Sequence, residues 1–116
     1  MTITLSSDVE LNLGDTGALD FTKFDSVTLA GEGTLKVITN QKTAINAKSL
    51  VVGKNVNLVV DGTNYVKGSY ADTDKNSTFV GIIASTSLVV NGGLDIDNFY
   101  TAIFVNGTCT FSADAD

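Results

Sequence analysis

The sequence DTDKN, which begins at Asp72, has the ligand spacing with which many calcium-binding loops open. Asp72, Asp74 and Asn76 would supply carboxylate and amide oxygens, the ligand atoms that Ca²⁺ prefers. The glycine expected at the sixth position is Ser77, and the bidentate glutamate expected at the twelfth is Ile83. The match is partial, so two interpretations stay open: a calcium site and a solvated acidic loop.

Two further carboxylates, Asp95 and Asp97, alternate with the apolar residues Leu94 and Ile96. Residues two apart in a strand point to the same face, about 6.5 to 7 Å from each other. Glycoside hydrolases use carboxyl pairs about 5 to 9.5 Å apart, so the spacing alone would permit catalysis. Because the apolar residues take the inner face, we expect the pair on the outer face. Solvated charges that protect a sheet are the first interpretation there, and a contact with a cation or a sugar is the second.

Exposed aromatic rings can stack on sugars through their faces. Tyr65, Tyr70, Phe99 and Tyr100 are the residues that we predict to do so if the ligand is a glycan. Phe99 and Tyr100 occupy a turn, where a pair of rings can instead close a corner of the core.

Catalytic machinery is mostly missing from this chain. It has no histidine, and its seven basic residues are all lysine, so the commonest general base and the guanidinium clamp for anions are both absent. No GxSxG, GxGxxG or GxxxxGK motif occurs. We expect a protein that is not an enzyme.

The composition is that of a strand-rich chain with an acidic surface. Hydrophobic residues make up 43% and charged residues 17%, with 11 glycines and no proline. The net charge of −6 disfavours nucleic acid and anionic membranes, which basic patches bind. No stretch approaches the roughly 18 apolar residues of a membrane helix, and no signal peptide is recognisable. Cations, neutral glycans and proteins remain as ligand classes.

Internal similarity is the strongest structural signal. From Val27, Leu50 and Leu88 the chain repeats one order: a short apolar alternation, a turn with Gly or Asn, a second alternation, a polar turn and a short third segment. The matching pairs are Val27 and Leu29, Leu50 and Val52, Leu88 and Val90 in the first segment; Leu35 and Val37, Leu58 and Val60, Leu94 and Ile96 in the second; and Ala44 and Ile45, Ile82 and Ile83, Ala102 and Ile103 in the third. A weaker copy precedes Val27, and a fifth begins at Cys109.

This repeat predicts one all-β domain over residues 1–116, a parallel β-solenoid with three short strands per coil and about four to five coils. The alternative is an antiparallel β-sandwich or meander, because Asn91-Gly92 and Asn106-Gly107 are strong hairpin signals. Residues 64–78 interrupt the repeat and are expected to form an inserted loop. Alternation within the last copy predicts that Cys109 points inward and is buried.

The order LVV, turn, LxI, turn, TAI resembles the right-handed parallel β-helix repeats of bacterial surface adhesins and of non-catalytic, calcium-dependent polysaccharide-binding domains. The resemblance implies an adhesin-type surface or structural module that binds a carbohydrate or a protein. Phage fibres have a similar β-strand composition rich in Gly, Asn, Thr and Ser, so a virion or extracellular filament protein is the alternative. A polysaccharide-degrading β-helix enzyme is the third, although pectate lyases use a basic residue, usually Arg, that is missing here.

These expectations place the protein outside the cell, on a cell surface or in a virion. A short stack of coils has open strand edges at both ends, and open edges pair with other chains. We therefore expect partners of three kinds: further copies of the chain, the rest of a longer array, or a polysaccharide.

Overall fold

The computed structural model describes residues 1–63, 79–112 and 115, and every regular element within them is a β-strand. Seven strands form sheet A: β1 (Thr2–Leu5), β3 (Leu19–Asp20), β4 (Val27–Gly31), β6 (Thr43–Val52), β8 (Val80–Val90), β10 (Thr101–Val105) and β11 (Thr108–Phe111). Four form sheet B: β2 (Val9–Gly14), β5 (Gly33–Thr39), β7 (Val56–Gly62) and β9 (Gly93–Asp97). The all-β class is confirmed. Across these described residues, no helix has the length and apolar character needed to cross a membrane.

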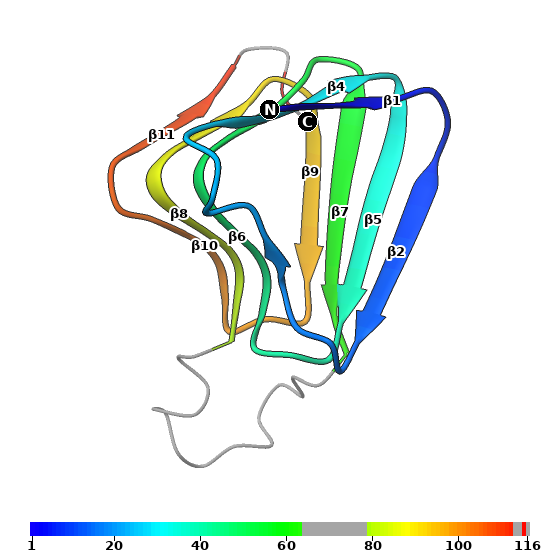
Figure 1. Ribbon diagram of the computed structural model, residues 1–116, viewed down its shortest axis with the longest axis vertical. Coiled ribbons are helices and arrows are strands. Elements are labelled where there is room, and N and C mark those ends of the chain that lie inside the picture. The colour runs from blue at the N-terminus through cyan, green and yellow to red at the C-terminus, as the bar shows by residue number, and fades with distance from the viewer. Residues whose placement is uncertain (64–78, 113–114, 116) are drawn as a thin grey trace.

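The chain passes repeatedly from sheet A to sheet B and back. Sheet B has the order β2-β5-β7-β9, and its strands lie side by side in Figure 1. Sheet A has the order β1-β4-β6-β8-β10, with β3 beside β6 and β11 beside β8. The long strand β8 pairs with β10 through residues 80–84 and with β11 through residues 87–90. The loop expected at 64–78 lies outside the described residues.

Every pairing among the described strands is parallel, so the antiparallel alternative is wrong. Asn91-Gly92 connects β8 of sheet A to β9 of sheet B, and Asn106-Gly107 connects two strands that both pair with β8. A two-residue hairpin of type I′ needs a positive φ at both central residues. None of these four residues has one, so both dipeptides form corners between parallel strands.

The repeated apolar residues face one another across the strands. Val27 is paired with Leu50, and Leu50 with Leu88; on sheet B, Leu35 is paired with Leu58, and Leu58 with Leu94. The first two segments of the repeat therefore match residue for residue. The third does not, because Ile45 and Ile103 both pair with Ile82; the matching pair is Gly81-Ile82, one residue before the predicted Ile82-Ile83.

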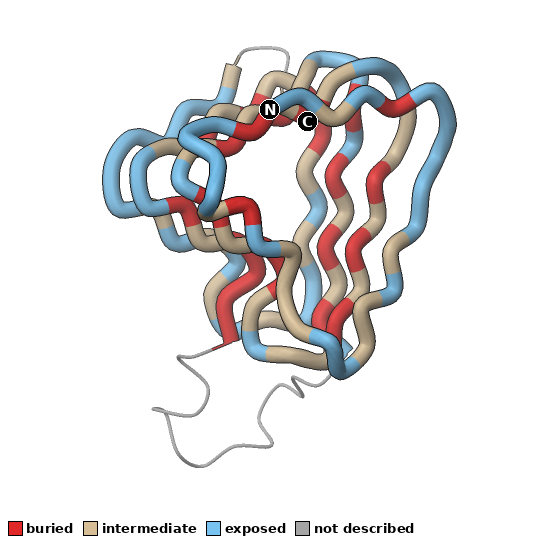
Figure 2. The backbone as a smooth tube through the Cα atoms, viewed as in Figure 1, coloured by how far each residue is buried: buried red, intermediate tan, exposed pale blue. Residues whose placement is uncertain are grey.

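The register-paired apolar residues form rows that cross the strands, and because side chains alternate along each strand, these rows all point into one core. On β5 and β7 every second residue is buried, which gives the alternating red bands of Figure 2. Val27, Leu50, Leu58 and Leu88 have no exposed surface, and fully burying a side chain of this size stabilises a protein by about 1.5–3 kcal/mol.

Cys109 departs from this pattern. It pairs with the buried Leu88, as its predicted inward position requires, yet the structure leaves it exposed. The prediction of a buried Cys109 is wrong because β11 is the last strand of its row in the part of the chain that the structure describes, and no other strand of that part covers it on the outer side.

Glycine at the corners is required by close approach of the backbone. A Cβ atom at Gly92 would overlap the carbonyl oxygens of Gly53 and Val56, and one at Gly107 would overlap the carbonyl oxygen of Thr86. A Cβ at Gly93 would instead meet the side-chain amide oxygen of Asn57, an exposed side chain that can turn away.

We predict that Gly92→Ala lowers the free energy of unfolding by about 1–3 kcal/mol, because backbone oxygens of the neighbouring strand connection must move. Gly93→Ala, one residue along, is the matched control and should cost clearly less. Urea denaturation of the two variants measures the difference, and equal losses would contradict the close approach at Gly92.

Candidate functional site

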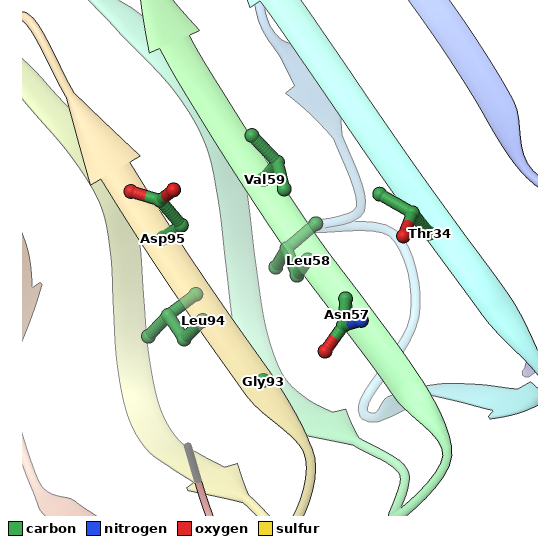
Figure 3. A pocket seen from close by; sticks show the side chains of 7 residues that line it. All are labelled: Thr34, Asn57, Leu58, Val59, Gly93, Leu94 and Asp95. Carbon is green, nitrogen blue, oxygen red and sulfur yellow. The ribbon is translucent and has the colours of Figure 1, made fainter.

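A shallow hollow of about 420 Å³ lies over β5, β7 and β9. We call it the sheet B hollow; it is lined by Thr34, Asn57, Leu58, Val59, Gly93, Leu94 and Asp95. Leu58 is fully buried, so the side chains available to a ligand are those of the outward residues drawn in Figure 3. Outward alternation on three adjacent strands therefore brings a hydroxyl, an amide and a carboxylate to one surface.

Strand register places the polar residues of the hollow next to one another. Thr34 pairs with Asn57, and Asn57 pairs with Gly93. Because Gly93 has no side chain, Asn57 lies over it, with its amide oxygen where a Cβ atom would be. Asp95 pairs with Val59 in the next outward row. The missing side chain at Gly93 thus leaves the room that the amide of Asn57 fills, beside Asp95.

The carboxylates Asp95 and Asp97 lie on the outer face of β9, as the alternation predicts, and both are exposed. Asp97 pairs with Asp61. Asn98, which has a positive φ of 67°, donates its side-chain N–H to Asp61 Oδ1 at 2.6 Å. This bond offsets part of the repulsion between the two neighbouring acids. Within residues 1–63, 79–112 and 115, no group of three or more His, Cys, Asp or Glu is placed to hold a metal ion.

The predicted aromatic residues divide into two groups. Phe99 packs against the core, and its ring lies over two glycines: a Cβ atom at Gly62 would come within 2.8 Å of it, and one at Gly81 within 3.4 Å. Phe99 therefore closes the corner after β9. Tyr100 is 52% exposed and keeps a free surface. Tyr65 and Tyr70, like the calcium candidates Asp72, Asp74 and Asn76, lie outside the described residues and stay predictions.

A second surface is the end of the molecule formed by β9, β10 and β11, which we call the C-terminal end. Among the described strands, β9 and β10 are the last of their sheets, and β11 pairs only with β8. The inward rows run out here: Val90 has no exposed surface, whereas its partner Phe111 is 53% exposed. Leu94, Ile96, Ile103 and Val105 are only partly buried. Unpaired strand edges and incompletely covered apolar side chains therefore coincide at this end.

Sequence reasoning missed Thr34, Asn57 and Gly93. Each is an ordinary polar or small residue in its own strand, and none forms a motif with its chain neighbours. The signal that could have found them is the alignment of the repeats, which puts all three one position before the matched Leu35, Leu58 and Leu94.

Asp20, the last residue of β3, has the only carboxyl pKa that is clearly shifted within the described part of the chain. Thr22 donates its hydroxyl at 2.5 Å and its backbone N–H at 2.9 Å to Asp20 Oδ1. These bonds to the charged form, the hydroxyl first, lower the pKa of Asp20 below its ordinary value of 3.8.

We predict that Thr22→Val raises the pKa of Asp20, because valine keeps the shape of threonine and removes the hydroxyl. The lowered pKa means that Asp20 stabilises the fold above its unfolded pKa of roughly 3.9, and that this contribution is lost as the pH falls through the folded pKa. Thr22→Val should reduce that contribution. Carboxyl NMR titration measures the pKa directly, and an identical value in both proteins would rule out the hydroxyl as its cause.

Comparisons with known proteins identify no relative of this chain. No family model matches the chain, and neither a curated protein nor a solved structure is significantly similar to it.

Proposed function

We propose that this protein is a non-catalytic surface or structural module of adhesin type, built as a parallel β-solenoid. It self-associates through its open coil ends and presents exposed surface to a carbohydrate or protein partner. Its place of action is outside the cell, on a cell surface or in a virion.

The strand register supports the solenoid. Each coil would contain one strand of sheet B and two segments of sheet A, since β6 and β8 each pair with one set of strands in their first half and another in their second. The first coil would be β1, β2 and β3, and β11 would begin the fifth. One apolar row per inward position then runs along the whole stack, as in repeat proteins whose units bury their core only against neighbours.

The C-terminal end is the observation that carries self-association. Within the described residues, its strands have no partner strand along one edge, and a free edge is a template for pairing with another chain. Phe111 stands at the end of an inward row with half of its surface exposed. A second chain on this end would cover both the backbone groups and the apolar side chains.

A non-catalytic role is supported by the chemistry of the chain. The chain has no histidine, the commonest general base, and no arginine, and the carboxylates Asp95 and Asp97 lie on an open outer face rather than across a cleft. A virion or extracellular filament protein is the second candidate, favoured by the same open end. It differs in needing no ligand, so assembly alone would define it.

We predict that the wild-type protein forms larger species as its concentration rises, and that Phe111→Lys raises the dissociation constant about tenfold or more. The substitution puts a charge at an inward position of the free edge and removes an apolar contact. Sedimentation velocity with calcium and with chelator measures the size distribution.

Ser85→Lys is the matched control, because it adds the same charge at an exposed position of β8, away from the free edges. It should associate like the wild type. A wild-type protein that stays monomeric at every concentration would overturn the self-association, as would equal effects of the two lysines.

A further inference from the structure

We propose that the sheet B hollow binds a neutral saccharide unit through Thr34, Asn57 and Asp95. The inference narrows the proposed function, on which it rests, from a carbohydrate or protein partner to one ligand class and one face of the molecule.

The size and shape of the hollow suit a small polar ligand. Its volume of about 420 Å³ falls in the range of about 300–1,000 Å³ that is typical of ligand sites. Asn57 on β7 and Asp95 on β9 border the hollow (Figure 3). The amide of Asn57 lies over the buried Gly93, so a ligand would meet this amide and the carboxylate of Asp95 rather than the strand backbone.

The polar groups around the hollow are free to bind. Among the described residues, no hydrogen bond engages the side chain of Asn57, the side chain of Asp95 or the hydroxyl of Thr34. The backbone N–H of Thr34 is engaged, because it donates to Asp8 Oδ1 at 2.8 Å. An amide donates two hydrogen bonds and accepts others, a hydroxyl does both, and a carboxylate accepts only. Adjacent hydroxyl groups of a sugar need this mixture, because each can donate and accept.

Val59 gives the hollow its apolar part. It pairs with Asp95 on the neighbouring strand and is partly exposed on the outer face. Sugars combine hydroxyl groups with apolar C–H surface, so an apolar side chain beside a carboxylate and an amide matches both kinds of surface.

Charge selects a neutral ligand over an anionic one. Asp95 lies in the hollow, with Asp97 on the same face of β9 and Asp61 beside Asp97, so a uronate or sialate would meet like charges. A lysine or arginine side chain is the competing ligand. It would need acceptors only, which leaves the donors of Asn57 and Thr34 unused, and Lys36 stands in the same outward row as Val59 and Asp95.

The test is an NMR titration of ¹⁵N-labelled protein with four probes: a soluble glucan oligosaccharide, a mannan oligosaccharide, polygalacturonate and an oligolysine peptide. We expect the backbone amide of Gly93 and the side-chain amide of Asn57 to shift with a neutral oligosaccharide and with neither charged probe. Asn57→Ala and Asp95→Asn should each weaken that binding about tenfold, the loss of one or two hydrogen bonds. Asp97→Asn, on the same face but outside the lining, should bind like the wild type.

Gly93→Ala tests the position of the Asn57 amide. Its new methyl group would displace this amide, so saccharide binding should weaken about tenfold, as in Asn57→Ala, while sedimentation is unchanged. That contrast separates this inference from the proposed function, which a protein that stays monomeric in sedimentation would contradict.

Four results would each overturn the saccharide site: no shift with either neutral probe, shifts centred elsewhere, equal effects of Asp97→Asn and Asp95→Asn, or a preference for oligolysine.

Discussion

Backbone hydrogen bonds between parallel strands are the constraint on which the rest of this structure depends. Because β7 pairs in continuous register with β5, and β9 with β7, a residue's position in the repeat decides whether it faces the core or the solvent. A shift of one residue would turn every side chain of a strand to the opposite face. The buried row through Leu58 and the outward row through Asn57 follow from this register, and the register of sheet A likewise sets the buried row through Leu50.

The repeat predicted much of the fold because strand alternation and a recurring order of segments are both visible in the chain. Val27, Leu50 and Leu88 were matched by pattern and are register partners. The pattern was less informative at corners. Asn91-Gly92 has the composition of a hairpin, but its glycine is needed where the backbone approaches Gly53 and Val56, a contact between distant segments that a local dipeptide does not reveal.

The candidate sites are harder to predict than the core, because they too depend on contacts between distant segments. A buried row can be recognised in the sequence by its hydrophobic residues, whereas Thr34, Asn57 and Gly93 come together only because three strands pair side by side. Exposure at the C-terminal end depends on what covers the last strand. Cys109 follows the inward alternation and is nevertheless exposed, since alternation gives direction and burial requires a neighbour.

Nuclear Overhauser contacts between strands test the central claim, the parallel register, most directly. The account predicts side-chain contacts from Leu50 to both Val27 and Leu88, and from Leu58 to both Leu35 and Leu94, without close Hα–Hα contacts between these strands. Antiparallel strands bring the Hα atoms of non-hydrogen-bonded pairs together, with Cα atoms about 4.5 Å apart. Strong Hα–Hα contacts between β8 and β9, across Asn91-Gly92, would show a hairpin there and contradict the register, the inward rows and the sheet B hollow together.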